Sequence, residues 1–373
     1  MNNPRNARTL PLVPLLLVAL LVLTLAAGCG KKAEQNGTVE QETEQQEPIV
    51  VPEPEPEPQP PAHVAPLTGM PCDEEAKLRP VAVMINNLKP ARPQSGLPHA
   101  DVVWEVLAEG GITRLIAIFQ SDEAYDGDIG PIRSIRPYMI ELAESYNAVI
   151  VHAGASNDAY AILQRQKKEH LDEITNAGSW FRRDKSRKAP HNLYSDLPSL
   201  RAGAEKRGYA ADVEVPAFRF LDDEGDGAQA GSAREIDIRF SLKSYIVTYR
   251  YDAEKGRYLR FINGEPHTDL VSGEQLAATN LVVLGTSHKV LDDEGRLAVD
   301  LNAGGPAMLI RRGEAIECAW ERDANGVIRL MKDGAELPFA RGTIYYHLVP
   351  DAKSVADHVT IRQPEAATEN SGA

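Results

Sequence analysis

The sequence predicts an α/β domain followed by a mostly antiparallel β domain, so the expected fold class is α+β / α/β. In residues 66–221, apolar strand-like runs alternate with segments of helical periodicity. In residues 236–350, apolar and polar residues alternate between turns rich in Gly, Asp and Asn. Residues 222–235 are mostly small and polar and are predicted to be a linker. At 373 residues the chain is long enough for two domains with their own cores.

A lipoprotein signal peptide is predicted over residues 1–29. Two arginines precede an apolar run that ends in Leu25-Ala26-Ala27-Gly28-Cys29. This pattern resembles the bacterial lipobox, in which Cys29 becomes the lipidated first residue of the mature protein. The alternative is an uncleaved transmembrane helix, which Pro11 and Pro14 would weaken. Both alternatives tether the chain to a cell membrane and leave it on the extracytoplasmic face.

Residues 30–65 are predicted to be a disordered spacer, and residues 351–373 a flexible tail. The spacer is mostly Gln, Glu, Pro and Thr and has almost no apolar side chains to bury. Between Pro52 and Pro58, proline alternates with glutamate, which favours an extended polyproline II conformation. We expect the spacer to hold the folded part away from the membrane surface.

In the first domain, the clearest strand predictions are three apolar runs: Val81–Ile85, Ile112–Phe119 and Ala148–Val151. Residues 100–108 fit either a further strand or a short helix. Helical periodicity predicts three helices, over residues 138–146, 157–163 and 197–206. Asn157 or Ser156 is predicted to cap the second helix; the alternative role of Ser156 as a nucleophile lacks the second glycine of a nucleophile elbow.

The second domain begins with a predicted β-hairpin, in which residues 245–251 and 257–262 flank a turn at 252–256. One helix is expected near residues 274–278. Further strands are predicted over residues 281–284, 297–301, 307–311, 315–320, 327–331 and 343–349.

Composition and charge argue against two kinds of binding partner, nucleic acid and metal ions. The chain is 25% charged and has a formal net charge of −14. This acidic balance argues against sequence-independent nucleic-acid binding, which needs a basic surface. Cys29, Cys72 and Cys318 form no CxxC pair, and no Cys/His spacing predicts a metal site. Cys72 and Cys318 are either free thiols or, in an oxidising compartment, a disulfide.

Four arginines are the main candidates for a ligand site: Arg92, Arg114, Arg133 and Arg136. Each lies near Gly or Pro at the end of an apolar run, and strand-end loops are where α/β sheets usually hold ligands. Guanidinium groups bind phosphate and carboxylate through paired donors. Their counterion is therefore either an anionic ligand or the protein's own Glu105 and Glu109.

Three further residues are candidates for acid/base or ion-pairing roles. Glu105 and Glu109 are four residues apart, so on a helix they would share a face and form an acid/base pair. Ion pairs with Arg114 or Arg133 are the alternative. His152 ends a strand-like run and is either a general base or a buried structural histidine.

His191 and Asn192 complete the list of candidate ligand-binding residues. They follow Lys185, Arg187 and Lys188, which would form a second basic wall. The sequence has no HExxH motif and no GxxxxGK phosphate-binding loop. It therefore assigns no catalytic residue, no cofactor and no metal.

Seven motifs in order resemble those of the YerB-like family of bacterial lipoproteins. They are Arg79–Asn87, Ala91–Leu97, Gly110–Arg114, Gly130–Arg136, Ala189–Tyr194, Gly264–Asp269 and His288–Val290. The resemblance covers roughly residues 66–350 and agrees with the lipobox. It implies N- and C-terminal domains of unknown function, and therefore no mechanism.

The order of parts from Thr113-Arg114 through Gly130–Arg136 to His152-Ala153-Gly154 is also similar to that of the LytR-CpsA-Psr envelope transferases. Those enzymes hold a polyprenyl pyrophosphate with arginines and transfer glycopolymer to peptidoglycan. This is an analogy of order alone. For an acidic metal-binding group like theirs, the sequence offers only Asp101, Asp122 and Asp126.

Three functions remain open. The first is a membrane-anchored lipoprotein that binds an envelope protein or an anionic cell-wall or lipid-linked phosphate ligand. The second is a phosphotransferase that acts on lipid-linked glycopolymer. The third is a protein–protein scaffold that pairs through exposed strand edges of the β domain.

Overall fold

A computed structural model describes residues 63–222 and 232–362, which all belong to one compact unit. The predicted signal peptide and almost all of the spacer lie outside the described residues. Most of the predicted linker and the last residues of the tail also lie outside them. The described chain is mostly β, as the sequence predicts for its second half.

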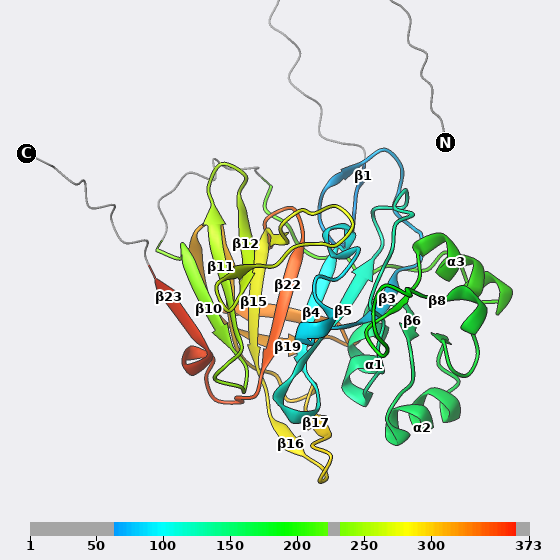
Figure 1. Cartoon of the computed structure of the whole chain (residues 1–373). Coiled ribbons are helices and arrows are strands. Elements are labelled where there is room, and N and C mark those ends of the chain that lie inside the picture. The colour runs from blue at the N-terminus through cyan, green and yellow to red at the C-terminus, as the bar shows by residue number, and fades with distance from the viewer. Residues whose placement is uncertain (1–62, 223–231, 363–373) are drawn as a thin grey trace, which may run out of the picture. The chain divides into compact units, whose positions relative to one another are not determined.

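An eleven-stranded sheet runs through the described residues (Figure 1), in the order β21-β20-β19-β18-β15-β22-β4-β5-β3-β6-β7. Its strands are β3 (Val81–Asn86), β4 (Val102–Leu107), β5 (Thr113–Phe119), β6 (Val149–His152), β7 (His170–Asp172), β15 (Asn280–Gly285), β18 (Gly305–Arg311), β19 (Glu314–Arg322), β20 (Ile328–Lys332), β21 (Ala335–Glu336) and β22 (Ile344–Val349). β22 comes late in the sequence but lies between β15 and β4, parallel to both. Segments 66–221 and 236–350 therefore both contribute strands to this sheet.

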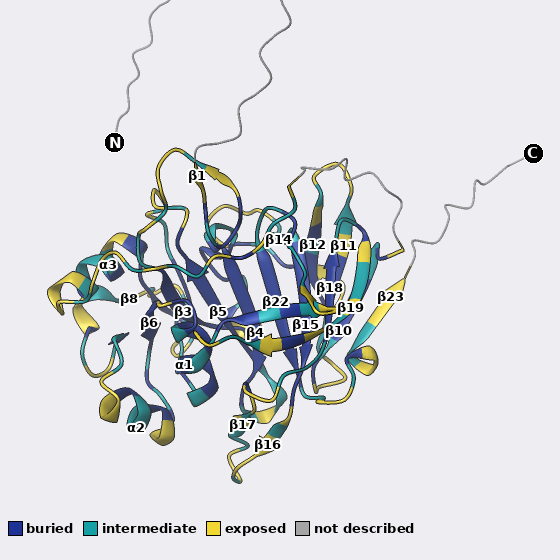
Figure 2. Cartoon of the chain, turned by 180° about the vertical axis from the view of Figure 1, so that it is seen from behind, coloured by how far each residue is buried: buried dark blue, intermediate teal, exposed yellow. Residues whose placement is uncertain are grey.

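The middle strands form because their sequences are apolar at almost every position, which is typical of strands covered on both faces. Every residue of β3, β4, β5, β15 and β22 is buried, and Figure 2 shows these strands buried along their length. Side chains alternate between the two faces. Val83 and Ile85 join one core cluster, and Ala82 and Met84 join the other.

A second, antiparallel sheet shares the core cluster of Val83 and Ile85. Its order is β13-β12-β11-β10-β23, with β14 pairing to β12. The strands are β10 (Glu235–Arg239), β11 (Ile246–Asp252), β12 (Arg257–Ile262), β13 (Glu265–Pro266), β14 (Ala277–Ala278) and β23 (Val359–Arg362). β11 and β12 pair as the predicted hairpin. β23 lies within the predicted tail and pairs with β10.

The predicted helices of the first half are confirmed as α1 (Pro137–Glu144), α2 (Asn157–Arg165) and α3 (Leu197–Lys206). α1 and α2 pack with Met84 on one face of the large sheet, and Leu200 of α3 packs with Ile85 on the other. Short 3-10 helices are η1 (Lys89–Ala91), η2 (Leu97–His99), η3 (Glu109–Gly111), η4 (Gly178–Trp180) and η5 (Ala356–His358). Small strand pairs are β1 (His63–Val64) with β2 (Pro71–Cys72), β8 (Arg182–Arg183) with β9 (Leu193–Tyr194), and β16 (His288–Val290) with β17 (Leu297–Val299).

One local prediction is wrong, and one alternative that the sequence left open is decided by the structure. The helix expected near residues 274–278 is absent, because Gln275 pairs with Thr268 and Ala277–Ala278 form β14. Residues 100–108 contain a strand, β4, rather than a helix.

Cys72 and Cys318 are both free thiols and form no disulfide with each other. No helix within 63–222 or 232–362 has the length and hydropathy needed to cross a membrane.

Candidate functional site

The candidate site lies at one edge of the large sheet, where several strands end together. β3, β6 and β7 are parallel, so their carboxyl ends lie at the same edge. β5 runs antiparallel to β3 and begins there, with Arg114 opposite Asn86. The loop after β3 carries Arg92. The sequence prediction that arginines gather at strand ends therefore has a structural basis.

The segment from Gly130 to Arg136 crosses this edge and holds two of the arginines in place. Ile132 bridges to Ile85 at the end of β3, and the Arg133 amide donates to Met84 O at 2.8 Å. Gly130 is required because an added Cβ would lie 2.7 Å from Leu193 O. The backbone of this segment is therefore fixed on both sides.

Arg114, Arg133 and Arg136 form what we call the arginine cluster. Burial, followed by the charge of Arg136, lowers the pKa of Arg114 to about 10. Burial and the same neighbouring charge lower the pKa of Arg133. Arg114 is satisfied in part by Ser134 O, which accepts from its Nη1 at 2.7 Å. Like charges are held together here by backbone packing.

One carboxylate, Glu109, contacts the arginine cluster. Arg136 donates from Nε to Glu109 and from Nη1 to the carbonyl oxygen of Ile135. Burial alone would raise the pKa of Glu109, but the hydrogen bond and charge of Arg136 make the net shift downward. Glu109 therefore stays ionised and offsets one of three positive charges.

The guanidinium of Arg133 has no hydrogen bond or ion pair to any residue that the structure describes, and its buried Nε has no acceptor. Arg92 also has a buried Nε without an acceptor, and its guanidinium lies 5.8 Å from the centre of the Tyr245 ring. Burial lowers the pKa of Arg92. A half-buried guanidinium that lacks a protein acceptor is open to an anionic ligand.

Glu105 does not form the helical acid/base pair with Glu109 that the sequence allowed. It lies in the middle of β4, whereas Glu109 lies in η3. Its Oε2 accepts from Arg260 Nη2 at 2.6 Å, and its Oε1 accepts from Thr113 at 2.7 Å and Tyr245 at 2.6 Å. Burial opposes ionisation of Glu105, but the charge of Arg260 makes the net pKa shift downward. Glu105 is thus the counterion of Arg260, not of the arginine cluster.

Arg260 and its partners are the main residues that sequence reasoning missed. Arg260 donates from Nε to His267 Nδ1 at 3.0 Å, and His267 in turn bonds Gln94 Oε1 at 2.6 Å. Tyr249 accepts from Arg260 and contacts His347 Nε2 at 3.0 Å. In a strand where apolar and polar residues alternate, an arginine is expected to face solvent, so the sequence offers no reason to place Arg260 in the core. The available signal was His267 in the motif Gly264–Asp269.

His191 and Asn192 lie in the loop between β8 and β9, directly before β9. Asn86 Nδ2 donates to His191 Nδ1 at 2.8 Å, so His191 borders the end of β3. Burial and then the charge of Arg133 lower the pKa of His191. Asn192 instead bonds its own loop, donating to Asp184 O at 3.1 Å. His191 is thus placed near the arginine cluster, and Asn192 shapes the loop.

His152 is buried at the end of β6, apart from the guanidinium groups. Its Nδ1 lies 3.0 Å from Gly154 O, and its Nε2 lies 3.0 Å from His170 Nδ1. Burial lowers the pKa of His152, and the carboxylate of Asp172 at 3.6 Å does not reverse this. His152 is therefore a neutral ring with both nitrogens occupied.

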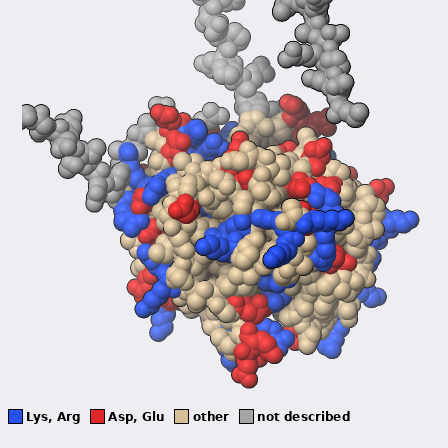
Figure 3. All heavy atoms as spheres, viewed as in Figure 1, with Lys and Arg blue, Asp and Glu red and all other residues tan. Residues whose placement is uncertain are grey.

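Basic side chains form a band across the middle of the face shown in Figure 3. β8 and the loop that follows it carry exposed cations: Arg182, Arg183, Lys185 and Lys188. Arg187 ties this region to the loop after β3 by donating to Ala91 O at 3.1 Å and Pro93 O at 3.0 Å. The predicted second basic wall thus packs against the loop that carries Arg92. Among the described residues, no cluster of His, Cys, Asp and Glu is arranged to hold a metal ion.

Comparisons with known proteins place these features in a family. A family model described as the N-terminal domain of a protein of unknown function (DUF3048) matches residues 67–210, and the corresponding C-terminal domain matches residues 236–346. The chain is 36% identical over 288 residues to the "Putative lipoprotein YerB" of Bacillus subtilis (strain 168), covering 77% of this chain and 86% of that protein. The structure is similar to the crystal structure of YerB protein from Bacillus subtilis, with a TM-score of 0.73 and 35% identity. That match covers 80% of this chain and 99% of the other.

Proposed function

The chain belongs to the DUF3048 family of YerB-like proteins, and we propose that it is a membrane-anchored envelope lipoprotein that binds an anionic, phosphate-bearing ligand. The observation that carries the proposal is Arg133, a half-buried cation without a counterion beside Arg114 and Arg136. A protein with a net charge of −14 has many carboxylates that could neutralise this group, yet among the described residues only Glu109 contacts the cluster.

Phosphate fits this edge better than a single carboxylate does. The cluster presents three guanidinium groups against one carboxylate, which leaves two positive charges for a ligand. A pyrophosphate offers several acceptor oxygens and more than one negative charge, so it can pair with both. His191 and Arg92 border the same edge and can supply further donors.

The test is calorimetric titration of the purified chain in detergent with a polyprenyl pyrophosphate, and separately with inorganic pyrophosphate. We expect saturable binding of the lipid. Each charge-assisted hydrogen bond contributes about 1.5–3 kcal/mol, so Arg133→Ala should weaken binding by roughly 10- to 100-fold. Arg250→Ala is the matched control, because Arg250 pairs with Glu235 on the second sheet.

Three outcomes would decide the matter. Absence of saturable binding, or equal affinity in Arg133→Ala, would refute the phosphate site. Binding of inorganic pyrophosphate as tightly as the lipid would locate recognition in the head group alone. Release of phosphate in the presence of Mg²⁺ would show transfer chemistry, which the proposal does not include.

Membrane anchoring is tested separately at Cys29. We propose that Cys29 is lipidated and that residues 1–28 are removed, so that Cys29 becomes the first residue of a chain held on the extracytoplasmic face. Metabolic labelling with a fatty acid should mark the wild type and not Cys29→Ala. A labelled Cys29→Ala chain, or an unlabelled and uncleaved wild type, would contradict this anchor.

A further inference from the structure

A cavity of about 670 Å³ lies at the opposite edge of the large sheet from the arginine cluster. It is bordered by the residues that precede β4, β15 and β22, which are parallel strands, so their amino ends meet there. Its volume is within the ~300–1,000 Å³ typical of small-molecule sites. Residues of both family segments line it, including Asp101 from the first and Thr343 from the second.

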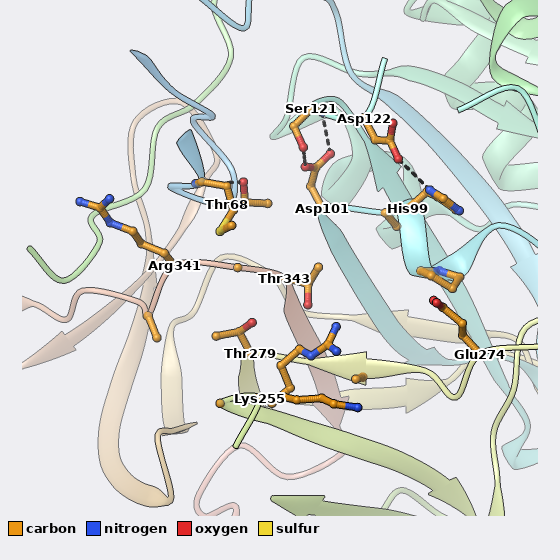
Figure 4. Close-up of a pocket in the computed structure, with 18 of the residues that line it drawn as sticks. Thr68, His99, Asp101, Ser121, Asp122, Lys255, Glu274, Thr279, Arg341 and Thr343 are labelled. Atoms are coloured by element: carbon orange, nitrogen blue, oxygen red, sulfur yellow. Dashed lines mark hydrogen bonds and ion pairs between the residues drawn. The ribbon is translucent and has the colours of Figure 1, made fainter. Parts of the chain in front are cut away.

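One wall of the cavity is acidic. Asp101 is 2% exposed, and its carboxylate accepts from the amides of Gln120 at 2.6 Å and Ser121 at 3.0 Å. Asp122 lies 2.7 Å from His99 Nδ1. Figure 4 shows Asp101, Asp122 and His99 together on one side of the cavity.

Cations line the other walls together with Glu254 and Glu274, and three of these cations lack a partner among the described residues. Lys255, Arg257 and Arg341 line the cavity, and none has a hydrogen bond from its side chain or an ion pair to any residue within the described ranges. The buried Nε of Arg341 has no acceptor. Figure 4 places Arg341 and Lys255 away from Asp122 and His99, with Thr343 between Lys255 and Asp101.

We propose that this cavity binds a short zwitterionic peptide, with its ammonium group toward the acidic wall and its carboxylate toward Arg341 and Lys255. A ligand that is only anionic would meet the carboxylates of Asp101 and Asp122, and a purely cationic ligand would meet three unpaired cations. A neutral sugar would bury these charges without neutralising them, which is costly. A zwitterion satisfies both walls. The hydroxyl groups of the lining threonines can bond its peptide group.

Titration of the full chain in detergent with L-alanyl-L-alanine tests this assignment. We expect saturable binding that weakens at least 10-fold when the dipeptide is N-acetylated and at least 10-fold when its carboxylate is converted to an amide. Asp122→Asn should remove the preference for the free ammonium group. Arg341→Met should remove the preference for the free carboxylate. Arg133→Ala, at the opposite edge, should leave dipeptide binding unchanged.

Several results would overturn the proposal. These are absence of saturable binding at millimolar dipeptide, equal binding of the blocked forms, and unchanged preferences in both variants. Tighter binding of a neutral disaccharide than of the dipeptide would also overturn it. Far-ultraviolet circular dichroism of each variant separates lost binding from lost folding; Arg341 and Asp122 are only half-buried and neither belongs to a strand. Binding of lipid pyrophosphate at the arginine cluster is independent of all these outcomes.

Discussion

Glu105 and Arg260 form an ion pair at the centre of the molecule, with both side chains no more than 2% exposed. Removing one partner of a buried pair leaves an uncompensated charge, which costs about 3–5 kcal/mol. We therefore expect Glu105→Ala to lower the free energy of unfolding by about that amount in urea denaturation. Thr113 and Tyr245 would lose an acceptor as well.

Glu294→Ala is the matched control for this prediction. Glu294 pairs with Arg296 at 3.3 Å, but its side chain is 70% exposed. Exposed ion pairs contribute little, so the urea midpoint should not move measurably. Equal effects of the two substitutions would contradict the description of Glu105 as a buried counterion.

Four histidines make stability depend on pH: the buried His152, His267 and His347, and the half-buried His170. Burial lowers the pKa of each, to about 4 for His170 and His347. An unfolded histidine has a pKa near ~6.5. Below that pH the unfolded chain binds protons that the folded chain does not, so stability present at pH 7 is lost as pH falls toward 4.

We expect the free energy of unfolding to fall between pH 7 and pH 5, by at most about 1.4 kcal/mol per pH unit for each histidine. Most carboxylates titrate near ~4, so they contribute little in this window. His170→Asn keeps a donor toward His152 Nε2 and should make the pH dependence shallower. A stability that is constant or rises over this range would rule out neutral buried histidines.

At the scale of single elements, α2 depends on its cap. Ser156 accepts from the amide of Ala159 at 3.3 Å, which confirms it as the cap of this helix. Ser156→Ala should destabilise the protein by about 1 kcal/mol, and Ser156→Asp should restore most of the loss. Thermal unfolding followed by circular dichroism measures both. Ser179→Ala, an exposed serine outside any α-helix, is the control.

Elements with a strong local signal could be predicted from sequence, and those set by distant partners could not. The apolar run Val81–Ile85 and the hairpin around residues 252–256 have the periodicity of the strands they form. Gln275 reads as part of a helix, but its side chain donates to Arg260 O at 2.7 Å and its backbone pairs with Thr268. The partners in those contacts lie outside residues 274–278, so the hydrophobic periodicity of this segment does not reveal them.

The same distinction applies to the candidate site. Glycine and proline around Arg133 and Arg136 marked rigid turns at strand ends, and the structure places both at the end of β3. The partner of Glu105 could not be inferred, because Arg260 is 155 residues away in an alternating strand. The sequence left open whether an anionic ligand or the nearby Glu105 and Glu109 neutralise the arginines. Glu109 pairs with Arg136 of the cluster, whereas Glu105 pairs with Arg260 of the second sheet.

At the scale of the whole molecule, the two family segments meet inside one sheet. β22 pairs in parallel with β4, and Trp104 stacks on Tyr346 with ring centroids 4.0 Å apart. Both strands are buried along their whole length. Each segment alone would therefore expose the apolar edge of a central strand to water, and the second segment would also expose Arg260 without its counterion.

We accordingly expect a chain cut within residues 223–231 to fold only when both pieces are present. Each purified piece should lack a cooperative urea transition, and mixing should restore one, because pairing of β4 with β22 buries surface that neither piece can cover alone. Tyr346→Ala should weaken reassociation by removing the stack on Trp104, whereas Val290→Ala, at a residue that is 63% exposed, should not. If residues 66–221 alone unfolded cooperatively at the midpoint of the intact chain, the two segments would be independent domains despite their shared sheet.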